Sequence, residues 1–516
     1  MRHAKVWPWL LAATLLSLAA PALGNGRFPR AARLLEDPQD SRHLLLAATY
    51  GLLTTKDGGQ TWHHICELSF GVYPVSADPL LELSSAGVLG GLLQGITLSE
   101  DGGCDFAPVL GGQQNQLIAD ISVDRSERSR VLGLSRTISD TSVVSELFES
   151  LDGGRSFESV GEPLLAGFDF PFTVDSAPSE PQRVYASGVS GDNIGRILRS
   201  NDGGSTWEPP LELSGTSSLN APYIAAIDPN RADLLYVRSD GRELVDGQVF
   251  AKDSLFVGDL TGEEGCQLVP GFCSVLTVRG KLLGFALSPE GDHVLLGVGD
   301  PQDPGFSVDP RLVGLYSGSA ADLLATEPGS SFPPAGFKRV HSAPVSCITW
   351  TASGIYVCTS QSQKGFALGF APDLISLEND ELTPLLDVTQ IVGPLECPAE
   401  TTTSLCGPEW EATCEDLGAC GNEPGTGGAA GAANEGPSGA SGGSSGTGNP
   451  APNGGEPSGT GATAGEGATA EPTDRDSEPD DSGCAVQAPL HGGNTSFALI
   501  AVALLFVLGR RTLNSA

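Results

Sequence analysis

Short apolar runs alternate with turn residues along residues 27–395. One unit opens with Leu35-Glu-Asp-Pro38 and continues through two strand-like runs, 43–49 and 52–55. The same order returns at Val174-Asp175 and in the two runs that follow it. Apolar alternation bounded by turn residues about every 8–12 positions is typical of β-strands, and the region needs no helical period. The pattern therefore predicts an all-β chain.

The unit repeats in the second half of the chain. Ile224–Pro229, Phe285–Pro289 and Val345–Trp350 each reopen it. Seven units fit into residues 27–395 at about 50 residues each, which is the length of a propeller blade. The sequence therefore predicts a seven-bladed β-propeller over 27–395, with six or eight blades as the alternatives. Closing the ring would remove the exposed sheet edges of an open array.

Four octapeptides recur within these units, and each reads Ser/Thr-x-Asp-Gly-Gly followed by two residues and an aromatic ring. They start at positions 55, 99, 150 and 200, so the intervals are 44, 51 and 50 residues. Asp-Gly-Gly supplies the positive-φ positions of a tight hairpin, the carboxylate can accept turn amides, and the ring can pack between blades. The positions expected to do this structural work are Asp57, Gly59, Trp62, Asp101, Gly103, Phe106, Asp152, Gly154, Phe157, Asp202, Gly204 and Trp207.

This pattern resembles the Asp-box, or BNR, repeat of sialidase-like, sortilin-like, xyloglucanase-like and photosystem II assembly-factor-like propellers. The resemblance implies hairpin turns that lie away from the central axis and serve the scaffold. It implies no catalytic role for Asp57, Asp101, Asp152 or Asp202.

Charge and cysteine content set the environment. The chain holds 63 acidic residues against 28 lysines and arginines, a formal charge of −35, which argues against nucleic acid as a partner because phosphate binding needs a cationic surface. Ten of the eleven cysteines lie between Cys66 and Cys420, and Cys484 stands alone. An even set is typical of disulfides in an oxidising compartment.

Some cysteine pairs follow from spacing. Cys347 and Cys358 flank the turn 351–354 symmetrically, which favours a cross-strand bridge. A local bridge between Cys266 and Cys273 is also expected, and a bridge between adjacent blades is expected for Cys66 and Cys104.

A terminal cluster of four cysteines surrounds Trp410. Its members are Cys397, Cys406, Cys414 and Cys420. Disulfides are favoured over a structural zinc site because the segment holds no histidine, and three pairings stay open. Residues 396–420 are expected to form a small cap that seals the last blade.

The two ends of the chain predict export and tethering. Residues 1–24 have the basic start, apolar run and small-residue cleavage site of a signal peptide. Residues 421–483 have the Gly/Ser/Pro/acidic composition of a disordered linker. The segment 484–516 combines Cys484, an apolar helix and a basic pair, and it resembles the myxobacterial C-terminal sorting signal.

That resemblance implies processing or lipidation at Cys484 and display on the outer envelope of a Gram-negative bacterium. An ordinary single-span membrane anchor stays open as the alternative, with the basic pair on the cytoplasmic side.

No spacing singles out a catalytic pair. The carboxylates weighed for a hydrolase are Asp120, Asp124, Asp169, Asp175 and Asp228. Asp175 and Asp228 stand at matching points of their units, which suggests a repeated turn. Trp350 is the aromatic to inspect as a sugar platform, although core packing is favoured.

Neither a metal nor another cofactor is expected. The acidic loop with Asp300, Asp303 and Asp309 could offer oxygen ligands to Ca²⁺, but its spacing matches no known calcium loop and a solvated turn is favoured.

Three functions remain open at this point. The first is a monomeric, non-enzymatic binding or scaffold module for an extracellular protein or glycan, tethered at the surface. The alternatives are a polysaccharide-active hydrolase of the xyloglucanase-like or sialidase-like kind and an assembly-factor-like role for an envelope complex. Fold analogy alone cannot rank them.

Overall fold

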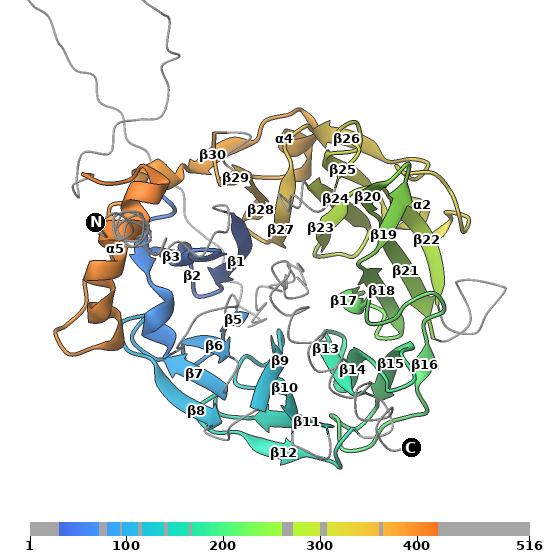
Figure 1. The fold of residues 1–516 in the computed structure, drawn as a ribbon, viewed down its shortest axis with the longest axis horizontal. Coiled ribbons are helices and arrows are strands. Elements are labelled where there is room, and N and C mark those ends of the chain that lie inside the picture. The colour runs from blue at the N-terminus through green and yellow to red at the C-terminus, as the bar shows by residue number, and fades with distance from the viewer. Residues whose placement is uncertain are drawn as a thin grey trace, which may run out of the picture. The chain divides into compact units, whose positions relative to one another are not determined.

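The described chain forms a ring of seven blades, each with four antiparallel strands, and a fifth short strand joins the first blade in parallel (Figure 1). The computed structural model describes residues 30–71, 80–92, 95–111, 116–138, 143–164, 168–260, 272–299, 307–360 and 365–421. The all-β, seven-bladed prediction is confirmed. The predicted signal peptide, the predicted linker after Gly421 and the segment with Cys484 lie outside the described residues.

Each of the first four blades is built from consecutive strands. Blade 1 contains β1 (Ala31–Asp37), β2 (Asp40–Ala48), β3 (Gly51–Thr55) and β4 (His63–Ile65), and blade 2 contains β5 (Leu80–Leu83), β6 (Val88–Leu92), β7 (Gly95–Ser99) and β8 (Ala107–Gly111). Blade 3 contains β9 (Gln116–Val123), β10 (Val131–Ile138), β11 (Val143–Ser150) and β12 (Glu158–Val160), and blade 4 contains β13 (Phe170–Ala177), β14 (Glu180–Val189), β15 (Gly195–Ser200) and β16 (Leu211–Glu212).

The remaining blades add insertions to the same plan. Blade 5 contains β17 (Pro222–Ile227), β18 (Leu234–Ser239), β21 (Asp253–Asp259) and β22 (Cys273–Val278), with the hairpin β19 (Arg242–Val245) and β20 (Gln248–Ala251) inserted. Blade 6 contains β23 (Lys281–Leu287), β24 (His293–Gly299), β25 (Gly314–Ser319) and β26 (Lys338–His341), and blade 7 contains β27 (Val345–Thr351), β28 (Gly354–Thr359), β29 (Leu368–Ala371) and β30 (Thr383–Leu386). The helices are η1 (Glu67–Phe70), α2 (Ala320–Leu324), α4 (Leu374–Glu378), η2 (Val388–Gln390), η3 (Thr402–Cys406) and α5 (Gly407–Leu417). No helix of the described residues is long and apolar enough to cross a membrane.

The two faces of the ring differ. Because consecutive strands of a blade are antiparallel, the turns after the first and third strands share one face, which carries the octapeptide turns and is here the Asp-box face. The connections after the second and fourth strands share the other face. It carries the β19–β20 hairpin and is here the insertion face.

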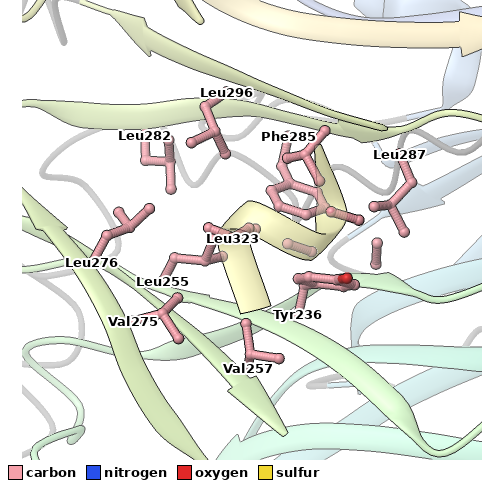
Figure 2. Packing of buried hydrophobic residues seen from close by; sticks show 14 of the residues in the cluster. Tyr236, Leu255, Val257, Val275, Leu276, Leu282, Phe285, Leu287, Leu296 and Leu323 are labelled. Carbon is pink, nitrogen blue, oxygen red and sulfur yellow. The ribbon is translucent and has the colours of Figure 1, made fainter. Parts of the chain in front are cut away.

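Apolar side chains between blades form the core. Figure 2 shows the cluster between blades 5 and 6, where Tyr236, Phe285 and Leu323 meet with several leucines and valines. The rings of Tyr236 and Phe285 lie 5.1 Å apart. Burying each such side chain stabilises the ring by about 1.5–3 kcal/mol. The alternation in the sequence thus supplies the packing that joins neighbouring blades.

Blades 7 and 1 meet where the ring closes, and each has its own four consecutive strands. The Ser346 hydroxyl donates to the Ala31 carbonyl at 2.6 Å, and the Thr349 hydroxyl donates to the Leu34 carbonyl at 3.1 Å. The chain then returns to blade 1, where the short strand β31 (Gly393–Pro394) pairs in parallel with β4. This return places the cap beside blade 1.

The cap is bonded to the first two blades and also packs against the last one, because Cys414 and Leu417 share a buried apolar cluster with Leu386 of blade 7. Cys406 is bonded to Cys66, and Cys397 is bonded to Cys104. The predicted bridge between Cys66 and Cys104 is therefore wrong, because parallel addition of β31 to β4 brings the cap cysteines alongside both positions.

Further contacts dock the cap onto the second octapeptide. The Thr403 hydroxyl donates to the Gly103 carbonyl at 2.6 Å, and the Phe106 amide donates to the Thr402 hydroxyl at 3.0 Å. Within the cap itself, Cys414 is bonded to Cys420. The cluster thus holds one internal pair and two cysteines that reach the ring.

The remaining described cysteines of the ring are also disulfide-bonded. Cys347 and Cys358 stand opposite each other in the β27–β28 ladder and form the expected bridge. Cys273 is disulfide-bonded, while Cys266, its predicted partner, lies outside the described residues.

Candidate functional site

The octapeptide aspartates form their hydrogen bonds within their own turns. In the first turn, one Asp57 oxygen accepts the Gln60 and Thr61 amides at 2.9 and 3.0 Å, and the other accepts the Thr61 hydroxyl at 2.5 Å. The Asp152 and Asp202 turns repeat this arrangement with Ser156 and Thr206. The hydrogen bond from the Ser156 hydroxyl helps to lower the pKa of Asp152 to about 2. These carboxylates are scaffold groups.

The octapeptide glycines and rings pack against the neighbouring blade. Gly59 has a φ of +89°, and a Cβ built on it would lie 2.7 Å from the Leu385 side chain of blade 7. Gly154 meets Leu89 of blade 2 at the same 2.7 Å. Trp62 is buried, and its indole N–H donates to the Gly59 carbonyl at 3.1 Å. A side chain at these glycines would separate two blades.

Polar side chains of one blade also accept backbone amides from the inner strand of the next blade. Asp120 of β9 accepts the Val174 amide of β13 at 2.9 Å. In the same way Thr173 accepts the amide of Ile224 at 3.0 Å, between blades 4 and 5. Asp253, fully buried, accepts the Leu282 amide of blade 6 at 3.0 Å. An inner strand has a free edge, so these acceptors satisfy amides that the ladder leaves unpaired.

Two of the weighed carboxylates belong to turns. Asp124 accepts the Ser126 amide at 2.9 Å and Asp228 accepts the Asn230 amide at 3.0 Å, each just after an inner strand. Asp175 is not their equivalent, because it pairs with Tyr185 inside the β13–β14 ladder. The interpretation of Asp175 as a repeated turn residue is therefore wrong, since the register places it two residues before the end of its strand.

Asp175 belongs to a group of charges on the inner strands and in the turn after β9, here called the inner-strand cluster. Its members are Arg33, Glu82, Asp120, Arg125 and Asp175, from blades 1 to 4. Arg33 forms an ion pair with Glu82, and Asp175 accepts the Ser122 hydroxyl at 2.9 Å with one oxygen. The other Asp175 oxygen is buried and has no hydrogen-bond partner.

This setting favours a proton on the acids. Burial raises the pKa of Asp175 to about 6. Burial, and then the charge of Asp175, also raise the pKa of Asp120. A carboxyl group whose pKa is raised toward neutrality can serve as a general acid. Sequence reasoning missed Arg33, Glu82 and Arg125, because residues from four blades share no local motif.

Neither Trp350 nor the described part of the acidic loop around Asp309 forms a binding site. Trp350 is buried in the core between blades 6 and 7, so it offers no sugar platform. Asp309 is bound by Arg311 at 2.6 Å, while Asp300 and Asp303 lie outside the described residues. No group of three or more metal-ligating side chains gathers in the described part of the chain.

The insertion face carries a β-hairpin added to the blade plan. The β19–β20 hairpin rests on the segment around Ser307, whose amide donates to the Val249 carbonyl at 2.9 Å and whose carbonyl accepts the Ala251 amide at 3.0 Å. Leu244 on β19 is 71% exposed. Leu244 is therefore accessible to another molecule, as are Leu151 and Ile375 on the Asp-box face, which are 68% and 73% exposed.

No protein-family model and no curated protein matches the chain. Among solved structures it is similar to an ancestral GH74 enzyme, at 14% identity and a TM-score of 0.45 over 70% of this chain and 47% of that one. A GH74 enzyme from Niastella koreensis is similar at 13% identity and a TM-score of 0.38, over 60% and 45% of the two chains. The extracellular domain of a one-component system from B. thetaiotaomicron is similar at 11% identity and 0.37, over 67% and 38%. The chain thus spans about half the length of the GH74 enzymes, and their activities stay properties of those proteins.

Proposed function

We propose that the protein is a non-enzymatic binding module for a glycan or protein outside the cell, and that it binds at the insertion face. The observation that carries this proposal is the braced hairpin that blade 5 adds to the insertion face. On the Asp-box face the aspartates are satisfied within their own turns. The insertion face instead presents a hairpin braced by the next blade, with Leu244 exposed. Binding residues are commonly carried on such loops over a rigid scaffold.

The setting of this module is extracellular. Four disulfides join described cysteines, and two of them span 340 and 293 residues. Disulfides of this kind persist in oxidising compartments. Display at a Gram-negative cell surface through the segment 484–516, with Cys484 as the tethering position, is part of the proposal and is supported by sequence alone.

One observation favours a second candidate function. In the inner-strand cluster, Asp175 keeps an unpartnered oxygen and a raised pKa beside Asp120. A hydrolase could use Asp175 as its proton donor. Against this, the two oxygens of Asp120 accept the Ile121 and Val174 amides at 3.0 and 2.9 Å. Asp120 therefore holds two blades together and does not act as the second, nucleophilic carboxylate of a hydrolase.

The test uses the ring with its cap, residues 25–420, because the disulfides bind these parts into one unit. The fragment is applied to a glycan array and to candidate envelope proteins, and bound polysaccharides are assayed for released reducing ends. We expect saturable binding that is weakened by Leu244→Ser or by insertion-face variants, with no release of reducing ends. The matched control is Leu405→Ser, an exposed leucine of the cap. Release of reducing ends that Asp175→Asn abolishes would establish the hydrolase instead.

A further inference from the structure

Arg136 of β10 differs from most arginines of the ring. Acids outnumber bases 63 to 28 in this chain, and ion pairs occupy arginines such as Arg130 with Glu149 and Arg199 with Glu208. Arg136 forms no ion pair with any described residue. A shortage of carboxylates is therefore not the reason that its guanidinium lacks one.

The guanidinium of Arg136 is held in a fixed plane. It lies over the Phe170 ring, 4.8 Å from the ring centroid. Stacking on an aromatic face orients the fork of N–H donors that recognises planar carboxylates. Burial lowers the pKa of Arg136, and the charge of nearby Asp169 raises it. Arg136 is thus a partly desolvated cation with donors to spare, next to one of the acids weighed from the sequence.

Phe172 occupies a special position in the repeat. Six of the seven inner strands contain a bulged residue that has no partner in the ladder. These residues are Ala32, Ala119, Phe172, Ala225, Leu283 and Ser346. Only β13, among the described inner strands, has an aromatic ring there. The repeat architecture does not demand this ring, since smaller side chains serve the other blades.

The Phe172 ring is held by the next blade. It lies 5.2 Å from the Tyr223 ring of β17, and Arg238, paired with Asp240 at 2.5 Å, lies over Tyr223 at 5.0 Å. Beneath these rings the Ile224 amide donates to Thr173, so the two strands are bonded at this point. Phe172 itself remains partly exposed while Tyr223 is buried.

These groups share the insertion face. Phe170 and Phe172 open β13, Tyr223 opens β17 and Arg136 is near the end of β10. Inner strands begin at this face, and second strands end there. The strands β13 and β17 are innermost in the ring (Figure 1). The arrangement therefore lies where the second strand of blade 3 and the inner strands of blades 4 and 5 meet the face that we propose for binding.

We propose that Arg136, Asp169, Phe170 and Phe172, here called the mouth site, bind a saccharide that carries a carboxylate. The inference rests on the proposed function and names its ligand class. Arg136 pairs with the ligand carboxylate through parallel N–H donors. The partly exposed ring of Phe172 packs against the apolar face of a sugar ring, and Asp169 accepts sugar hydroxyls. An acidic peptide would use Arg136 but has no comparable need for both the ring and the acceptor.

Long-range charge opposes this ligand, so the test must isolate the local contacts. The chain has a formal charge of −35, which repels any anion at a distance. At 0.15 M salt the Debye length is about 8 Å, and contacts within the mouth site then dominate. Titrations are therefore made at this ionic strength with two matched pairs of probes: tetragalacturonate with galactotetraose, and oligoglucuronate with cellotetraose.

We expect at least one carboxylated probe to bind about 10-fold or more tightly than its neutral counterpart, which is a difference of about 1.4 kcal/mol. Arg136→Gln should remove that preference. Phe172→Ala should weaken both members of the pair, whereas Leu283→Ala, the same bulge position in blade 6, should change neither. Thermal unfolding of each variant checks that the ring remains folded.

The contradicting results are distinct from failure of the proposed function. Equal binding of neutral and carboxylated probes, or a preference that survives Arg136→Gln, would overturn the mouth site as assigned. Binding of none of the four probes would overturn it too, even if the glycan array or a protein partner supports the binding module. If neither the glycan array nor the candidate envelope proteins contain any ligand that binds, the proposed function itself is overturned.

Discussion

Removing the two long-range disulfides one after the other should lower the free energy of unfolding by a smaller amount for the first bond than for the second. All four strands of blade 1 come from the start of the described chain and all four of blade 7 from its later part. Only hydrogen bonds, apolar packing and the cap therefore hold these blades together. The bonds Cys66–Cys406 and Cys104–Cys397 are the covalent part of that closure.

The magnitude follows from loop closure in the unfolded chain. A bond that closes 293 residues, as Cys104–Cys397 does when alone, stabilises by about 5.7 kcal/mol in the chain-entropy relation. When Cys66–Cys406 is also present, the additional loop is only the difference between the separations of 340 and 293, or 47 residues. The same relation then gives about 4 kcal/mol. The first bond removed should thus cost less than the second.

Guanidinium denaturation without reductant, followed by tryptophan fluorescence, measures this difference. The variants are Cys104→Ser with Cys397→Ser, Cys66→Ser with Cys406→Ser, and all four together. Cys414→Ser with Cys420→Ser is the control, because its bond spans 6 residues and should contribute about 2 kcal/mol. If either long-range pair cost no more than the control, or if the two costs were simply additive, the cap would not be the covalent closure of the ring.

Three further outcomes are expected. Gly59→Ala should destabilise by about 1–3 kcal/mol more than Gly71→Ala, because both glycines have positive φ but only Gly59 meets a neighbouring blade; equal losses in urea unfolding would refute the contact. Asp175 has a folded pKa of about 6, raised from 3.8, so its charge destabilises the fold above pH 6 and this penalty fades as pH falls to 4. Asp175→Asn should therefore add up to about 3 kcal/mol at pH 7 and little at pH 4, and a pH-independent change would contradict this. Burial lowers the pKa of His64 to about 4 from 6.5, so stability should fall by about 3 kcal/mol between pH 6.5 and 4; an imidazole NMR titration with a midpoint near 6.5 would contradict it.

The repeat was readable from the sequence because local chemistry dictates it. A turn built on Asp-Gly-Gly needs those residues wherever it occurs, so Asp57 and its counterparts mark the blades without knowledge of the fold. The cross-strand pair Cys347 and Cys358 was readable for the same reason, since its geometry depends on one hairpin.

Contacts between residues far apart in the sequence could not be predicted from it. The pairing of Cys66 with Cys406 depends on β31, a parallel strand of only two residues, which leaves no periodic signal. The position of Asp175 inside its ladder depends on strand register, and neighbouring units differ in turn length. The inner-strand cluster consists of residues from four blades, so no local sequence motif predicts it.

The central claim is that this propeller binds its ligand at the insertion face and does not cleave it. The most direct measurement is to incubate the 25–420 fragment with each polysaccharide that it binds and to quantify reducing ends over time, beside Asp175→Asn and Phe172→Ala. The account predicts no release by any of the three proteins and weaker binding by Phe172→Ala alone. Steady release by the unmodified protein that Asp175→Asn abolishes would contradict it.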